Sequence, residues 1–195
     1  MSARNGAAKG RLIAVEGSGG RSMAVAVKRI ERDLRHQQVE SGASTWDASA
    51  IFFQILNGAR GIPSPSPRAL ILLYAADLAF RLRWQIAPAL EEGATVIAAP
   101  YVETVIGFGR AAGLPRLWLK NVFEFAPAPG ALWRVPESSI MVNKRPGPAD
   151  SFLEFSLSQL RLGPAVWDTE EIRRGFHYHL DQLTVRGKCK VAGAS

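Results

Sequence analysis

Short apolar runs alternate with longer amphipathic segments along most of the chain. Three runs are rich in apolar side chains and read as buried strands, at Leu12–Val15, Thr95–Ala98 and Ala131–Val135. After the first run, apolar residues recur at helical spacing, at Met23, Val27, Ile30 and Leu34. This alternation of strands with helices predicts a parallel sheet covered by helices on both faces.

The remaining segments differ in how clearly they are patterned. Gln38–Thr45 is weakly patterned and is expected to hold a poor second strand. The strongest helix is expected over Arg68–Glu92, with Gly93 as its stop and Pro88 kinking it or starting its last turns. Gly58–Pro67 reads as a loop because it is dense in Gly, Ser and Pro. Further helices are expected at Trp46–Leu56, Pro115–Ala126, Phe152–Leu162 and Asp168–Leu183.

The bulk composition fits a single domain. The 195 residues are 47% apolar, and we expect one domain over residues 11–186 with tails at 1–10, expected to be disordered, and 187–195. No apolar run is long enough to cross a membrane, and the N-terminus lacks the apolar core of a signal peptide. The single cysteine, Cys189, excludes an internal disulfide and fits a reduced, cytoplasmic setting.

Basic residues outnumber acidic ones, giving a net charge of +7. They are scattered through the sequence without a run of five, so specific binding of nucleic acid is not expected. No metal site is expected, because His177 and His179 would face different sides of a helix and lack accompanying carboxylates.

A glycine-rich turn joins the first predicted strand to the first helix, reading Gly17-Ser-Gly-Gly-Arg-Ser22. This is the layout of a P-loop, G-x-x-x-x-G-K-[ST], but two residues shorter and with Arg21 in place of lysine. We expect a phosphate or other anion to bind at Gly17, Gly19, Gly20, Arg21 and Ser22, with Arg21 and Ser22 as candidate catalytic residues. The alternative is a plain glycine turn in which Ser22 caps the helix.

Four separated pieces of the chain resemble thymidylate kinase, a P-loop nucleoside-monophosphate kinase. Val15-Glu-Gly17 matches the family's F-E-G, and Leu72-Leu-Tyr-Ala-Ala-Asp77 matches L-L-[FY]-A-A-D-R. Ile86-Ala-Pro-Ala-Leu-Glu-Glu-Gly93 matches I-x-P-A-L-x-x-G, and Val96, Ile97 and Tyr101 match V-I-x-D-R-Y. The order and spacing agree over about residues 11–137. The resemblance implies a three-layer P-loop NTPase fold, a homodimer, and ATP with Mg²⁺ as cofactors of an active member.

The resemblance also places the remnant of an acceptor-nucleotide pocket at Tyr74, Asp77, Arg81, Tyr101 and Phe108. Tyr74 matches the aromatic residue that stacks near the base, and the alternative is a core aromatic. The arginine that follows the family's Asp is replaced by Leu78, and Arg81, one turn on, either reaches similar space or is a solvated surface residue. We favour the surface interpretation for Arg81.

Several residues that the family uses for phosphoryl transfer are replaced. Ala99-Pro100 stand where the family has Asp-Arg, and neither residue can hold a cation or donate to a phosphate. The R-E-P-G-G-T element has no counterpart in Val39–Ala50. Arg134 replaces a common aspartate, and Lys144-Arg145 lie in the region of the lid, where a flexible basic loop is the alternative to a catalytic role.

The sequence therefore supports two hypotheses. In the first, the chain is a degenerate, catalytically inactive thymidylate-kinase-like protein that binds or scaffolds, as a homodimer or with another protein. In the second, it is a divergent active nucleoside-monophosphate kinase that transfers the γ-phosphate of ATP to dTMP or a similar nucleotide. That kinase would use Arg21, Ser22, Arg81 and Lys144.

Overall fold

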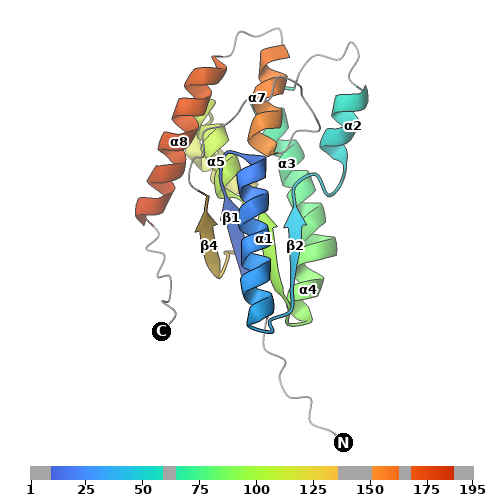
Figure 1. Cartoon of the computed structure of the whole chain (residues 1–195). Helices are drawn as coiled ribbons and strands as arrows, with labels where there is room; N and C mark the ends of the chain where they lie inside the picture. Colours follow the sequence, from blue (N-terminus) through green and yellow to red (C-terminus); the bar gives the residue numbers. More distant parts are fainter. Residues whose placement is uncertain (1–9, 59–64, 136–150, 163–167, 187–195) are drawn as a thin grey trace, which may run out of the picture.

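The computed structural model describes residues 10–58, 65–135, 151–162 and 168–186 (Figure 1). The strands are β1 (Leu12–Glu16), β2 (Ser41–Thr45), β3 (Thr95–Ala99) and β4 (Ala131–Arg134). The helices are α1 (Gly20–His36), α2 (Ile51–Gly58), α3 (Pro67–Arg81), α4 (Ala87–Glu91), α5 (Glu103–Ala111), α6 (Arg116–Val122), α7 (Phe152–Leu162) and α8 (Thr169–Arg186). A π-helical segment, η1 (Leu82–Ile86), joins α3 to α4. Among the described helices, none has the length and apolar character needed to span a membrane.

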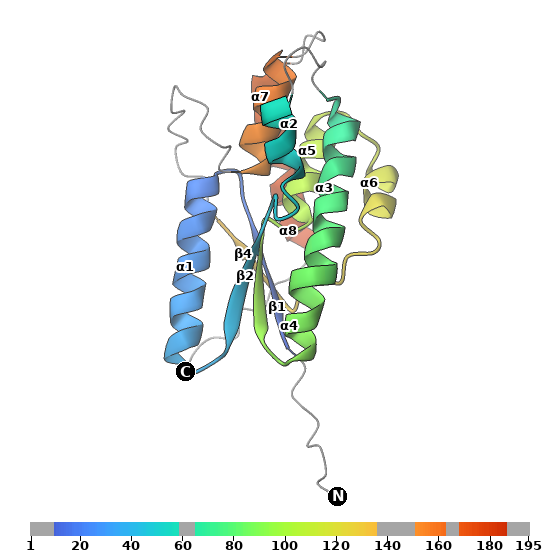
Figure 2. The ribbon, with the colours of Figure 1, turned by 90° about the vertical axis from the view of Figure 1, so that its right-hand side faces the viewer.

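The four strands form one parallel sheet in the order β2-β3-β1-β4. Figure 2 shows α1 on one face of this sheet and α3 and α4 on the other. Side chains of β1 alternate between the two faces, because successive residues of a strand point to opposite sides. Ile13 and Val15 pack with α1, whereas Leu12 and Ala14 join the larger core on the opposite face. The chain thus has the predicted three-layer α/β, P-loop NTPase-like fold.

The long helix expected over Arg68–Glu92 is present as the run α3-η1-α4. Its departure from a regular α-helix falls just before Pro88, which lies at the start of α4. A proline lacks the N–H that an α-helix needs at this place, and its ring crowds the preceding turn. The wider π turn accommodates both effects, so the predicted kink takes the form of a local change of helix type.

Helix α5 is an element that the sequence pattern did not predict. It contains Gly107 and Gly109, which weaken helix propensity. Both glycines are required by packing: a Cβ on Gly109 would lie 2.6 Å from a methyl group of Leu119, and one on Gly107 would lie 3.2 Å from the ring of Phe176. Tertiary contacts therefore override local propensity here. The largest differences in the other boundaries are in α2, which begins at Ile51 instead of Trp46, and in α6, which ends at Val122 instead of Ala126.

Phe152 stands at the centre of an aromatic cluster on the α3 side of the sheet. Its ring centroid lies 4.8 Å from that of Tyr74, 5.5 Å from Phe108, 6.0 Å from Phe52 and 6.4 Å from Trp46. Phe155, one turn further along α7, contacts Phe52 and Trp46 as well. These ring contacts bring α7 against Trp46 and against residues within α2, α3 and α5. The cluster therefore joins distant parts of the chain in one core.

We predict that Phe152→Ala lowers the free energy of unfolding by about 3–5 kcal/mol, because it removes a fully buried ring and leaves a cavity. Phe53→Ala on α2 is the matched control, since Phe53 is 55% exposed and its loss changes stability by less than about 0.5 kcal/mol. Urea denaturation measures both. Equal losses in the two variants would contradict the central role given to Phe152.

Candidate functional site

The glycine turn lies where β1 ends and α1 begins, at the carboxyl edge of the sheet. In open α/β sheets, ligands bind at this edge, between strands whose connections run in opposite directions. Gly17 is buried, and its N–H donates to Thr104 Oγ1 at 3.1 Å. That N–H is therefore already bonded within the protein and does not face an anion. Gly17 is also required for space, because a Cβ there would lie 3.1 Å from Cβ of Val135.

The part of the turn that remains suited to an anion is the start of α1. Gly19 precedes the helix with extended backbone and supplies no capping side chain. The N–H groups that begin an α-helix have no carbonyl partner within the helix, and α1 begins at Gly20 and Arg21. Arg21 is exposed and Ser22 is half-buried. Of the five residues predicted to bind phosphate, four thus lie at this helix start, while Gly17 is held away by Thr104.

The start of α7 contacts the same turn. The hydroxyl group of Ser151, the residue just before α7, donates to the carbonyl oxygen of Ser18 at 3.1 Å. Ser151 Oγ also accepts a bond from the N–H of Glu154, so it caps α7 while it contacts the turn. Both serines are buried. The sequence did not single out Ser151, because a contact between residues so far apart leaves no local pattern.

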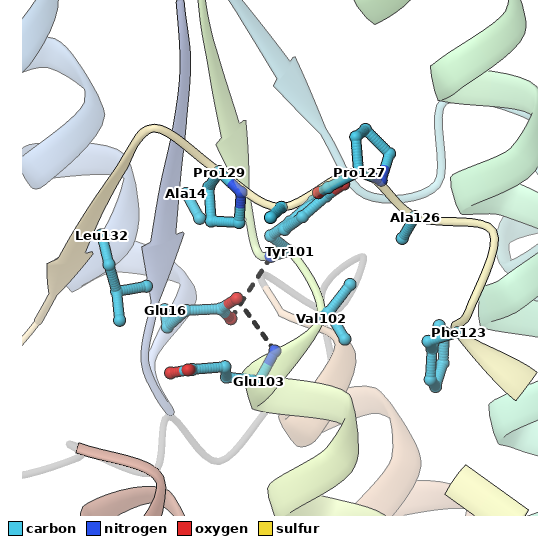
Figure 3. Close-up of a pocket in the computed structure, with 11 residues that line it drawn as sticks. Ala14, Glu16, Tyr101, Val102, Glu103, Phe123, Ala126, Pro127, Pro129 and Leu132 are labelled. Carbon is cyan, nitrogen blue, oxygen red and sulfur yellow. Dashed lines mark hydrogen bonds between the residues drawn. The ribbon is translucent and has the colours of Figure 1, made fainter. Parts of the chain in front are cut away.

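A buried carboxylate, Glu16, organises the edge of the sheet beside this turn. Its oxygens accept bonds from the backbone N–H groups of Glu103 and Thr104 at 3.0 and 2.9 Å, and from the hydroxyl of Thr104 at 2.6 Å. The N–H of Tyr101 adds a longer bond of 3.3 Å. Figure 3 shows the carboxylate directed at the backbone of this segment. Glu16 therefore caps α5 from a neighbouring strand.

Burial raises the pKa of the Glu16 carboxyl above its ordinary value, although the bonds from Thr104 act in the opposite direction. Burial likewise raises the pKa of Glu103, which forms an ion pair of 2.5 Å with Arg134. The two carboxylates border a cavity of about 200 Å³ between β1 and residues 126–129 (Figure 3). Arg134, an apparent charge reversal in the sequence, is thus the partner of Glu103.

The end of β3 carries no group that could bind a cation or a phosphate. Pro100 follows Ala99 through a cis peptide bond. The carbonyl oxygen of Pro100 accepts bonds from the Tyr74 hydroxyl at 2.8 Å and from Arg81 Nη1 at 3.1 Å. Tyr101 is also buried, and its hydroxyl donates to the carbonyl oxygen of Pro127 at 2.8 Å. The backbone and side-chain groups that follow β3 are therefore engaged in hydrogen bonds within the protein.

The interpretation of Arg81 as a solvated surface residue is wrong. The side chain is fully buried and points across the end of the sheet. Its guanidinium donates to the carbonyl oxygen of Ser44 at 2.6 Å and to Ser44 Oγ at 3.0 Å, besides Pro100 and the Tyr74 hydroxyl. Within the described part of the chain, no ion pair compensates its charge. Arg81 is therefore a clamp between α3 and the ends of β2 and β3.

Of the predicted acceptor pocket, the structure brings Tyr74, Arg81 and Tyr101 together around Pro100. Tyr74 is fully buried, and burial raises the pKa of its hydroxyl. Phe108 is a core residue that reaches Tyr74 only through Phe152. Asp77 points elsewhere and fixes the turn after β2, since its oxygens accept from the backbone N–H groups of Asp47 and Ser49 at 3.0 and 2.9 Å.

A second cavity, a groove of about 470 Å³, runs between α1 and the edge of the sheet at β2. It touches the glycine turn through Gly20 and is otherwise walled by Trp46, Pro100 and the side of α1. Across the described residues, no group of three or more His, Cys, Asp or Glu is placed to hold a metal ion. Lys144 and Arg145, the candidate lid residues, lie outside the described part.

Comparisons with known proteins find similarity to probable thymidylate kinases. A probable thymidylate kinase of Pyrococcus abyssi is 41% identical over 64 residues, which are 33% of this chain and 31% of that protein. A probable thymidylate kinase of Pyrobaculum aerophilum is 27% identical over 118 residues, 60% of this chain and 59% of that protein. The chain thus spans less than two thirds of the length of these curated relatives. No family model matches it. The likeness supports a weak relationship to thymidylate kinases, and with the fold it indicates a nucleotide-kinase-like protein.

Proposed function

We propose that this chain is a degenerate thymidylate-kinase-like protein that no longer transfers phosphate and acts by binding. Its partner is a second copy of itself or another protein, and its setting is the reduced cytoplasm. The names of its relatives provide the starting point, because a thymidylate kinase needs an acceptor pocket, a phosphate loop and charged groups that stabilise the moving phosphoryl group. The contacts of the described residues expected at these parts support the proposal.

The observation that carries the proposal is that the residues expected to form an acceptor pocket are buried and that their polar groups are hydrogen-bonded within the protein. A base can stack on an aromatic ring only if one face of the ring is open. The ring of Tyr74 is fully buried, with Phe152 at 4.8 Å and Phe123 at 6.2 Å. Its hydroxyl is bonded to the backbone of Pro100 and Tyr101. The groups that would hold an acceptor nucleotide are thus engaged in the core.

The phosphate-binding parts support the same proposal. At the end of β3, Ala99 and Pro100 offer neither a carboxylate for Mg²⁺ nor a cation for phosphate. The N–H of Gly17 is taken by Thr104, so the turn presents fewer donors than a full P-loop. Because single positive groups contribute about 10³–10⁵ in rate to phosphoryl transfer, losing several together leaves little catalysis.

The competing hypothesis is a divergent active kinase, and one feature favours it. The start of α1 still presents backbone N–H groups together with Arg21 and Ser22, which suits a phosphate and, through Ser22, Mg²⁺. An active kinase would bind ATP–Mg²⁺ and dTMP and would form dTDP, whereas the degenerate protein would do neither. Measurements of nucleotide binding and of dTDP formation therefore separate the two hypotheses.

We predict no Mg²⁺-dependent formation of dTDP from dTMP and ATP above the background rate, and no thermal stabilisation by ATP–Mg²⁺ or dTMP. A coupled assay and a thermal-shift titration measure these outcomes, with a thymidylate kinase of established activity as positive control. The matched variant is Arg21→Ala with Ser22→Ala. Turnover in the wild type that disappears in this variant would overturn the proposal, whereas turnover that survives in it comes from a contaminating kinase.

We predict that Arg81→Lys lowers the free energy of unfolding by about 1–3 kcal/mol, because an ammonium group cannot reach Ser44, Tyr74 and Pro100 together. Arg83→Lys, two residues on and exposed, is the matched control and changes stability by less than about 0.5 kcal/mol. Chemical denaturation provides the measurement. An Arg81 variant as stable as the Arg83 variant would contradict the role of Arg81 as an internal clamp.

The exposed side of α3 and η1 supports the proposal of a homodimer. Leu72, Phe80 and Trp84 are 52%, 39% and 65% exposed, and with Ala76 they recur every fourth residue along α3 and η1. Residues four apart lie on one side of a helix, so these four form an exposed apolar stripe. Such stripes are typical of protein interfaces.

We predict that the wild-type protein sediments as a dimer and that Leu72→Asp weakens its self-association at least tenfold, since a charge would be buried in the interface. Leu117→Asp on α6 is the control, because Leu117 is 70% exposed and lies outside the stripe. Sedimentation equilibrium measures both. A monomeric wild-type protein, or equal weakening by the two substitutions, would refute the proposed interface.

A further inference from the structure

Helix α1 carries a row of positive charges on its solvent-facing side. Arg21, Lys28, Arg32 and Arg35 are all exposed. With 3.6 residues per turn, they fall within an arc of about 60° and extend over about 21 Å along the helix. In the sequence these charges are scattered, because the four residues are seven, four and three positions apart. The helix brings them into one line, which we call the α1 row.

Few acidic side chains neutralise the positive charge of the α1 row. Helix α1 holds five Lys and Arg residues and two acidic residues, so it supplies +3 of the net charge of +7. Asp33 lies 3.9 Å from both Arg29 and Arg32, and these side chains are at least half exposed, so the pairs contribute little. In the described part of the chain, neither Lys28 nor Arg35 takes part in an ion pair. The row therefore presents a positive potential to a partner.

An exposed aromatic side chain lies beside the α1 row. Trp133 belongs to β4, the last strand on one side of the sheet, and is 38% exposed. The guanidinium of Arg29, on the turn of α1 that also carries Lys28, lies 5.7 Å from the centre of its ring. A row of cations next to an aromatic ring is the combination that proteins use to bind single-stranded nucleic acid.

A lipid surface is a poorer partner for this helix. Helices that lie on membranes insert an apolar face among the lipids. The apolar face of α1 is already buried against the sheet, through Met23, Ala26, Val27 and Ile30. Val25 is an exposed apolar residue next to the row, and one valine offers little surface for insertion. The geometry thus favours a polyanion that contacts only the charged side.

We propose that the α1 row binds the phosphate backbone of single-stranded nucleic acid without sequence preference, and that an unpaired base stacks on Trp133. The row shares Arg21 with the glycine turn, but Lys28, Arg32 and Arg35 lie further along α1, so the activity does not depend on phosphoryl transfer. Four cations in line match a few successive phosphates, so the interaction is weak and depends strongly on salt.

Fluorescence anisotropy with a labelled oligothymidylate of about twenty nucleotides tests the proposal. The logarithm of the association constant is expected to fall with the logarithm of salt concentration with a slope of about −2 to −3, or about −0.7 for each phosphate contacted. Lys28→Glu with Arg32→Glu is expected to weaken binding at least tenfold and to reduce the slope by about 1.4.

The matched control reverses Arg116 and Lys120 on α6, which are also exposed, four residues apart and positively charged. This double variant has the same net charge as the α1 variant and is expected to bind within about threefold of the wild type, since its charges lie on a different helix. Thermal midpoints verify that both variants fold. Absence of binding by the wild type, or equal losses in the two variants, would overturn the proposal.

Trp133→Ala tests the stacking contact. We expect at least fivefold weaker binding of the single strand, unchanged binding of a duplex, and recovery in Trp133→Phe, because a phenyl ring still stacks. Equal losses for single strand and duplex would refute the stacking role. Anionic vesicles provide the last arm: vesicle binding that exceeds oligonucleotide binding and is lost in the α1 variant would assign the row to a membrane and refute the proposal.

Discussion

A buried carboxylate at the end of β1 holds the carboxyl edge of the sheet in place. Glu16 accepts the first N–H groups of α5 and the hydroxyl of Thr104, while the same hydroxyl oxygen accepts the N–H of Gly17. One negative group therefore caps a helix that has no capping side chain of its own, and it fixes the start of the glycine turn. The position of α5 in turn sets where Phe108 and its neighbours lie. The aromatic core is built upon that placement.

Two adjacent residues at the start of α7 join the glycine turn to the aromatic cluster. Ser151 bonds to the glycine turn, and the next residue, Phe152, fills the space between Tyr74 and Phe108. The start of α7 thus contacts both the glycine turn and the aromatic cluster through adjacent residues. A ligand that entered either place would have to displace the start of α7, and it would break buried contacts in doing so. This cost is the physical basis for proposing that the chain binds through its outer surfaces.

Much of the fold was predictable from the sequence, and the exceptions have identifiable causes. The strands β1, β3 and β4 were recognisable as apolar runs, and α1 from its periodicity. Helix α5 was missed because Gly107 and Gly109 lower helix propensity, and their reason lies in the rings and methyl groups of Phe176 and Leu119. At the site, the glycine turn was found, but the bond from Gly17 to Thr104 spans 87 positions and leaves no local trace. A single sequence does not show which distant residues will form hydrogen bonds with its buried polar groups.

Arg81 illustrates why hydrogen-bond partners from distant parts of the chain matter for the stability of a buried charge. In an active site, a buried arginine is balanced by the anion that it binds, and without that anion its burial is unfavourable. Here the guanidinium bonds to Ser44, Tyr74 and Pro100, so the charge is stabilised by fixed dipoles of the protein itself. The carbonyl oxygen of Pro100 is available to it at the end of β3, beside the place where the kinases carry a charged pair. Internal partners of this kind stabilise a buried arginine without a bound anion, so the proposed loss of substrate contacts is compatible with an intact fold.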